Sequence, residues 1–110
     1  MSEVFNLSAA DLAALLCSRV CHDIISPVGA INNGLELLDE GDATEEAMAL
    51  VRTSARKASA RLQFARIAFG AAGSAGMLID TGDAEAVANA YLRDEKPELV
   101  WQGRRALLPK

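Results

Sequence analysis

One short run of the chain combines an imidazole, a carboxylate and a helix-weakening proline: His22-Asp23-Ile24-Ile25-Ser26-Pro27. His22 is the only histidine, so any imidazole chemistry must take place there. An imidazole nitrogen that a neighbouring acid assists can act as a nucleophile and accept a phosphoryl group. This run therefore has the residue types that a phosphate-accepting histidine needs.

Asp23 and Ser26 are the nearest candidates to assist His22. Asp23 could take or hold the proton of the ring nitrogen opposite the attacking one, which would raise nucleophilicity and fix the tautomer. Ser26 follows His22 by one helical turn, so it shares the same face and could bond a phosphate oxygen. Two plainer interpretations stay open: His22 as an ordinary half-exposed histidine, and Ser26 as a helical serine that donates to the carbonyl of His22.

A long helix is predicted to carry this run from about residue 8 to about residue 40, a length of about 50 Å. Ser8 can cap it with Asp11 at the capping-box position, and Gly41 can end it. Pro27 should bend or weaken it, because proline leaves the carbonyl of Asp23 without its usual amide donor. The apolar stripe of this helix consists of Leu12, Leu16, Val20, Ile24, Ile31, Leu35 and Leu38.

A second helix is predicted to begin almost at once, with Asp42 or Thr44 as its cap, so the two helices must be antiparallel. Its inward face consists of Ala47, Val51, Ser54, Ala58, Leu62, Ala65 and Phe69. Such a hairpin leaves too much apolar surface exposed to be stable alone. Two copies in a four-helix bundle would cover that surface, so we predict a parallel homodimer.

Charges are unevenly distributed along this predicted hairpin. With equal rise along both helices, residues whose numbers sum to about 84 lie side by side, which places His22 level with Leu62. The basic residues near His22 are then Arg19, Arg52, Arg56, Lys57, Arg61 and Arg66, whereas six acidic residues gather at the hairpin turn. This arrangement would attract a phosphoryl group or an acidic partner to His22, although an ordinary solvated helix face is the alternative.

The chain after the hairpin predicts a small α/β piece. Residues 70–76 indicate a helix end or linker, followed by a strand at residues 77–80, a helix at residues 83–94 and a second strand at residues 98–101. This piece is too small to be a domain. It either packs on the bundle or is the first part of a larger α/β module.

Bulk properties favour a helical, cytoplasmic protein. Only 5% of residues are aromatic, and the net charge of −4 disfavours nucleic acid and anionic lipid as partners. Uninterrupted apolar runs are shorter than the ~18 residues of a membrane span, and the N-terminus lacks the basic start of a secretory signal. Cys17 and Cys21 are predicted to be reduced and at least half-buried, and we disfavour the alternative of a metal site with His22.

The same residues carry a family resemblance. His22-Asp23-Ile24-Ile25-Ser26-Pro27, with Ile31 and Asn33-Gly34-Leu35-Glu36-Leu37-Leu38, resembles the H-box of bacterial sensor histidine kinases. More closely, residues 15–38 are similar to the ChpT-type histidine phosphotransferases of alphaproteobacterial cell-cycle phosphorelays, and the similarity extends along the whole chain.

The resemblance implies a fold and an activity. Residues 1–76 would be the dimerisation and histidine phosphotransfer hairpin with His22 as phosphoacceptor, and residues 77–110 the start of a degenerate ATPase-like domain. Phosphate would come from the receiver domain of a hybrid kinase and pass to response regulators. Such a chain would use no ATP, because its phosphate comes from the receiver. It would also need no cofactor of its own, because the receiver supplies Mg²⁺. The residues expected to dock phosphate or the receiver are Arg19, Ser26, Arg56, Arg61 and Arg66.

Two rival functions remain open on the sequence alone. One is the dimerisation and phosphoacceptor core of a sensor histidine kinase whose ATP domain is missing. The other is a structural helical module that only oligomerises. Labelling by a phosphorylated receiver separates the second rival from the family function.

Overall fold

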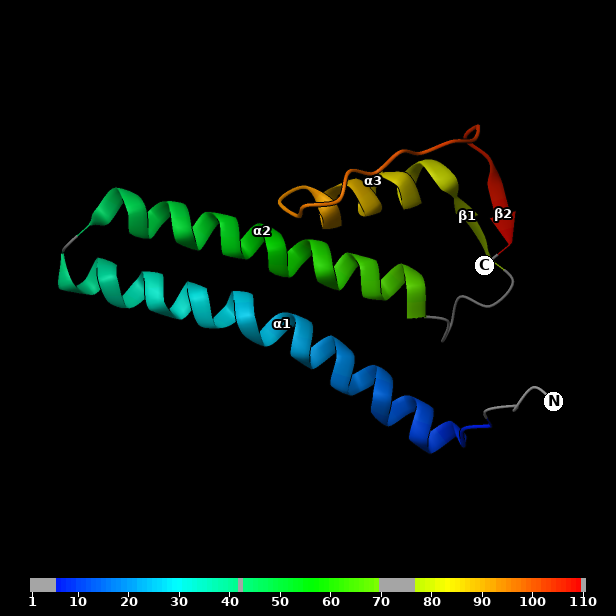
Figure 1. The fold of residues 1–110 in the computed structure, drawn as a ribbon, viewed down its shortest axis with the longest axis horizontal. Coiled ribbons are helices and arrows are strands. Elements are labelled where there is room, and N and C mark those ends of the chain that lie inside the picture. The colour runs from blue at the N-terminus through cyan, green and yellow to red at the C-terminus, as the bar shows by residue number, and fades with distance from the viewer. Residues whose placement is uncertain (1–5, 42, 70–76, 110) are drawn as a thin grey trace.

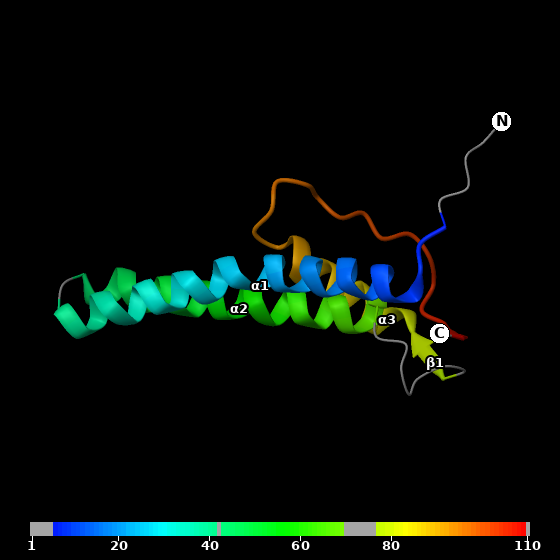
Figure 2. The same ribbon diagram turned by 90° about the horizontal axis from the view of Figure 1, so that it is seen from below.

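The computed structural model describes residues 6–41, 43–69 and 77–109, which form three helices and one two-stranded sheet (Figure 1). The elements are α1 (Ala9–Glu40), α2 (Thr44–Phe69), β1 (Leu78–Asp80), α3 (Thr81–Leu92) and β2 (Leu107–Pro109). α2 lies between α1 and α3, and the segment that joins α3 to β2 arches away to one side of the helices (Figures 1 and 2). The predicted mainly helical fold is confirmed.

Local capping sets both ends of α1. Ser8 caps its start, with the Ser8 hydroxyl accepting from the Asp11 amide at 3.1 Å. Gly41 ends it in the left-handed conformation, with φ of 77°, and donates its amide to the Leu38 carbonyl at 3.1 Å. Both ends agree with the prediction. The predicted cap at Asp42 and the predicted boundary at residues 70–76 lie outside the described residues.

Small residues let α1 and α2 approach closely near the hairpin tip. A Cβ built on Gly34 would lie 2.6 Å from the Cγ2 atom of Val51 and 3.1 Å from the carbonyl oxygen of Ala47. Ala47 and Ser54 are themselves buried. The predicted inward face of the second helix is therefore confirmed in this half of the hairpin.

The two helices separate toward the N-terminus of α1. Figure 1 shows α1 lying along α2 from the tip to its middle and then diverging, and the helix has Pro27 in its interior. A proline inside a helix removes a hydrogen bond and bends it. Leu62 and Phe69 of the expected inward face consequently stay exposed, at 49% and 43%.

β1 pairs with β2 in antiparallel register, with Ile79 opposite Leu108. The predicted first strand is confirmed apart from its first residue, and the predicted helix begins two residues earlier, at Thr81. The prediction of a second strand at residues 98–101 was wrong, because that segment has no strand conformation and the strand lies at Leu107–Pro109 instead.

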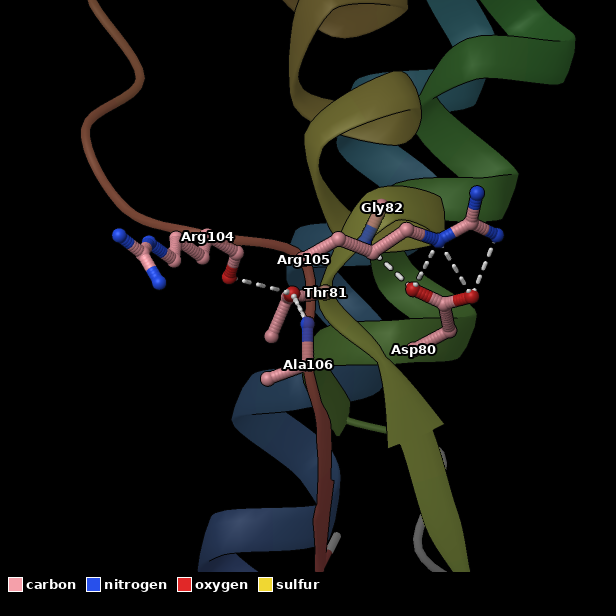
Figure 3. Close-up of polar contacts among 6 residues, drawn as sticks. All are labelled: Asp80, Thr81, Gly82, Arg104, Arg105 and Ala106. Carbon is pink, nitrogen blue, oxygen red and sulfur yellow. Dashed lines mark hydrogen bonds and ion pairs between the residues drawn. The ribbon is translucent and has the colours of Figure 1, made fainter.

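Side-chain bonds at the end of β1 explain where the second strand lies (Figure 3). The carboxylate of Asp80 accepts from the Arg105 Nε atom at 2.9 and 2.8 Å and from the Gly82 amide at 2.8 Å. The Ala106 amide donates to the Thr81 hydroxyl at 2.8 Å, and the Thr81 amide donates to the Ala106 carbonyl at 2.9 Å. These bonds hold the chain just before β2 against β1.

The chain is elongated and has very little core. Its radius of gyration is 18.0 Å, whereas a compact domain of this size has about 13 Å. The buried residues of the described ranges are Pro27, Gly34, Ala47 and Ser54, and no large side chain there is fully buried. Much apolar surface of α1 and α2 is therefore uncovered in a single chain.

By length and composition, α1 is apolar enough to cross a membrane, although little of it is buried. The uninterrupted apolar runs of α1 are short, as the sequence shows, but the scattered polar residues that break them do not lower the average hydropathy enough to exclude this helix by composition. The helix of a bundle needs the same composition, since it must bury apolar side chains against several neighbours. Length and composition by themselves are therefore weak evidence for a membrane span.

Candidate functional site

His22 projects from the middle of α1, and its side chain is 83% exposed. Its Nδ1 atom lies 3.8 Å from the Oδ1 atom of Asp23, which is longer than a hydrogen bond. In this conformation the carboxylate acts on the ring through its charge. An imidazole this exposed could meet an atom of another protein through Nε2, the ring nitrogen opposite the one that faces Asp23.

The carboxylate of Asp23 is held between two side chains of α1. Its Oδ2 atom lies 3.4 Å from the Nε atom of Arg19, one turn earlier, and the Asp23 side chain is only 22% exposed. Arg19 is 63% exposed, so it still faces solvent. The predicted acid of His22 thus lies at the histidine, and Arg19 fixes it there.

Arg61 reaches the same residue from α2. Its Nη1 atom donates to the backbone carbonyl of Asp23 at 2.6 Å, and its Nη2 atom lies 3.8 Å from the Oε1 atom of Glu95. The contact confirms the predicted alignment of the two helices, in which residue numbers sum to about 84. Sequence reasoning placed Arg61 near His22 as a docking residue and missed both of these partners.

The other predicted docking residues are exposed on their own helices. The Arg56 guanidinium donates to the Thr53 hydroxyl at 3.4 Å, and the Arg66 Nε atom donates to the Gln63 side chain at 3.0 Å. Ser26 is exposed on α1. The structure therefore brings Arg19 and Arg61 together at Asp23, whereas Arg56 and Arg66 each bond a side chain one turn earlier on α2.

Cys17 and Cys21 are free and exposed, so the prediction that they are at least half-buried was wrong for a single chain. They lie on a part of α1 that no other described element covers. A hydrogen bond with Cys17 is the main cause that raises the pKa of Cys21, which keeps this thiol protonated. Among residues 6–41, 43–69 and 77–109, no group of His, Cys, Asp or Glu is arranged to hold a metal ion.

A cavity of about 330 Å³ lies between α2 and the end of α3. Basic residues of α2 and residues of α3 and the following turn line it together, among them Arg56, Lys57, Arg61, Tyr91 and Glu95. Sequence reasoning did not find it, since it depends on how α3 packs on α2. Arg61 therefore has this cavity on one side and α1 on the other.

Comparison with known proteins gives two close relatives. The chain is 74% identical, over all of its 110 residues, to the protein phosphotransferase ChpT of Brucella abortus (strain 2308), of which it covers 53%. It matches 51% of a solved structure described as a bacterial phosphotransferase, with a TM-score of 0.85, 70% identity and 98% of this chain covered. No protein family model matches the chain. The predicted resemblance to ChpT-type proteins is confirmed, and the chain spans about half the length of the relatives it matches.

Proposed function

We propose that this chain, which is similar to ChpT-type phosphotransferases over its whole length, carries phosphate on His22 as an intermediate of a phosphorelay. One observation carries the proposal. The His22 side chain is 83% exposed and lies beside the Asp23 carboxylate, in a chain 74% identical to a protein phosphotransferase. An exposed nucleophile is what a transfer between two proteins requires.

The chemical step is an exchange of one phosphorus bond for another. The lone pair of Nε2 attacks the phosphorus of an aspartyl phosphate on a receiver domain, the N–P bond forms, and the acyl O–P bond breaks to release the receiver carboxylate. The proton on Nδ1 stays there, and the nearby carboxylate of Asp23 stabilises the positive ring. The reverse step on a second receiver returns the phosphate. Positioning and charge neutralisation supply most of the catalysis.

The basic residues around this step are proposed to receive the acidic partner. Three of them, Arg19, Arg56 and Arg66, are exposed near the level of His22, and Ser26 lies one turn beyond His22, whereas the Arg61 guanidinium is bonded to the Asp23 carbonyl. A receiver carries a cluster of carboxylates with Mg²⁺, so positive charge favours the encounter complex. The chain itself would need neither ATP nor a cofactor for this step.

A homodimer is proposed as the working form. Val28, Leu35 and Cys17 share one face of α1, about 120–140° away from His22, and are exposed in the single chain. A second hairpin on this face would give a four-helix bundle that covers the apolar surface and leaves His22 open to solvent. On this proposal residues 1–76 form the dimeric phosphotransfer hairpin, residues 77–110 begin a degenerate ATPase-like domain, and the protein is cytoplasmic.

Transfer of label from a receiver tests this function. The chain is incubated with a receiver domain carrying radiolabelled aspartyl phosphate and Mg²⁺, and separately with labelled ATP. We expect an acid-labile label from the receiver, its loss in His22→Ala, its retention in the control Glu40→Gln at the hairpin tip, and no label from ATP. Labelling from ATP alone would instead indicate a kinase core, and label that persists in His22→Ala would refute the site.

A further inference from the structure

We propose that Arg61 is a positioning residue, which replaces a missing backbone amide next to His22 and connects that point of α1 to the turn after α3. The proposal rests on the proposed function of His22, because the geometry that Arg61 fixes matters through the transfer step. Docking of a partner is a different role, and the two make different predictions.

The missing amide is that of Pro27. In an α-helix the carbonyl of residue 23 accepts from the amide of residue 27, but proline has no N–H. Pro27 is buried, so its surroundings offer this carbonyl little water. An unpaired carbonyl in a partly buried place is costly. The Arg61 Nη1 atom fills the vacancy at 2.6 Å, and a charged donor makes this bond stronger than the amide bond it replaces.

The bond acts on the residue that follows the phosphoacceptor directly. The carbonyl belongs to Asp23, and the side chain of the same residue lies 3.8 Å from the His22 ring. A change in the bend therefore moves the acid, and the histidine joined to it, relative to the rest of the hairpin. Because phosphoryl transfer depends mainly on alignment, a small displacement here reduces the rate.

The second Nη atom of Arg61 faces the C-terminal piece. It lies 3.8 Å from Glu95, whose amide donates to the Leu92 carbonyl at 3.1 Å at the end of α3. The Arg61 and Glu95 side chains are 24% and 41% exposed. One guanidinium thus joins α1, α2 and the end of α3, which needs the fork of donors that arginine has and lysine lacks. A displacement of α3 would be passed to the bend beside His22.

Transfer kinetics distinguish positioning from docking. We expect Arg61→Met to lower the rate at saturating receiver by about 10- to 100-fold while the KM for receiver stays unchanged. Glu95→Gln should lower the same rate by less, and Arg61→Lys should lie between wild type and Arg61→Met. The matched controls Arg104→Met, whose side chain points away from its neighbours (Figure 3), and Glu98→Gln should leave both parameters unchanged. A raised KM with an unchanged saturated rate would overturn the proposal.

Restoring the amide provides a second test. In Pro27→Ala the amide of residue 27 can again donate to the Asp23 carbonyl. Adding Arg61→Met to this variant should therefore lower the transfer rate much less than Arg61→Met does in wild type. The midpoint of urea unfolding should also fall less. Equal losses in the two backgrounds would contradict the role of Arg61. The comparison of unfolding midpoints among wild type, the two single variants and the double variant needs no phosphate. A chain that is never labelled therefore refutes the proposed function, whereas unfolding effects that simply add refute the contact between Arg61 and the Pro27 bend.

Discussion

Two arginines of this chain each bind an oxygen of a residue distant in sequence. Arg61 donates to the Asp23 carbonyl, and Arg105 donates to both carboxylate oxygens of Asp80. In each case the planar fork lets one side chain join two segments, so these contacts fix where the segments lie. At the scale of residues, arginine bonds therefore supply two of the long-range contacts that place the elements of this molecule.

The Asp80 contact predicts a pH dependence. Hydrogen bonds from Arg105, and then from the Gly82 amide, lower the pKa of Asp80 below its ordinary value of 3.8. A carboxyl whose pKa is lowered on folding stabilises the fold fully above that ordinary value, and this contribution is lost as pH falls through the lower folded pKa. We expect hydrogen exchange at the Thr81 and Ala106 amides, corrected for intrinsic rates, to become faster only below pH 3.8.

Substitution of the carboxyl provides the control for this pH effect. Asp80→Asn should expose the same two amides at neutral pH and remove the acid step, whereas Asp94→Asn, at an exposed position, should keep it. An acid step of unchanged size in Asp80→Asn would show that another group is responsible.

At the scale of elements, the close approach of α1 and α2 depends on a single glycine. Gly34 and Gly29 lie in the same helix, but only Gly34 faces atoms of α2 within van der Waals distance, while a Cβ on Gly29 would meet nothing within 4 Å. The backbone oxygen of Ala47 is one of the atoms that Gly34 faces, so the helices themselves would have to move apart to accept a methyl group.

The two glycines therefore predict opposite effects. Gly34→Ala should lower the free energy of unfolding by about 1–3 kcal/mol, because overpacking outweighs the gain in helix propensity. Gly29→Ala should raise it by about 0.5–1 kcal/mol, because alanine favours the helix and has room. Urea unfolding of the two variants measures both. A stable Gly34→Ala would mean that the helices can separate at the tip without cost.

Elements were predictable where local residues decide them. Ser8 and Gly41 set the ends of α1 through bonds within one turn, and both were predicted. The second strand was misplaced because the Asp80–Arg105 pair selects it, and no local pattern encodes that pair. For Arg61 the sequence contained both halves of the contact, the carbonyl that Pro27 leaves free and the alignment of the helices. Only the structure joined them, because the reach of one side chain decides it.

At the scale of the whole molecule, the main feature is an apolar surface with no cover. Val28 and Leu35, which share one face of α1 with the exposed Cys17, are 42% and 46% exposed, in a chain whose radius of gyration is 18.0 Å. Surface of this extent on a folded chain usually marks an interface. A second copy is the simplest cover, since it would place equivalent faces together around a twofold axis.

A dimer can be tested by mass in solution. We expect light scattering coupled to size exclusion to give twice the chain mass of 11.6 kDa. Leu35→Glu should give single chains, because a buried carboxylate without a partner is costly. Asn33→Glu, an exposed position about 160° away around the same helix, should remain dimeric. A wild-type chain that elutes as a monomer at micromolar concentration would remove the dimer from the proposal.

Two of the contacts between α1 and α2 are specific in their geometry, the tight approach at Gly34 and Val51 and the bond from Arg61 to Asp23. Because both contacts form in the same structure, the number of α2 residues between Val51 and Arg61 is fixed. An insertion or deletion of one residue between Val51 and Arg61 would rotate Arg61 by about 100° around α2 and away from the carbonyl. During divergence the exposed positions of this stretch can therefore exchange their side chains, whereas its buried Ser54 is constrained by packing and its length can change only if α1 changes with it.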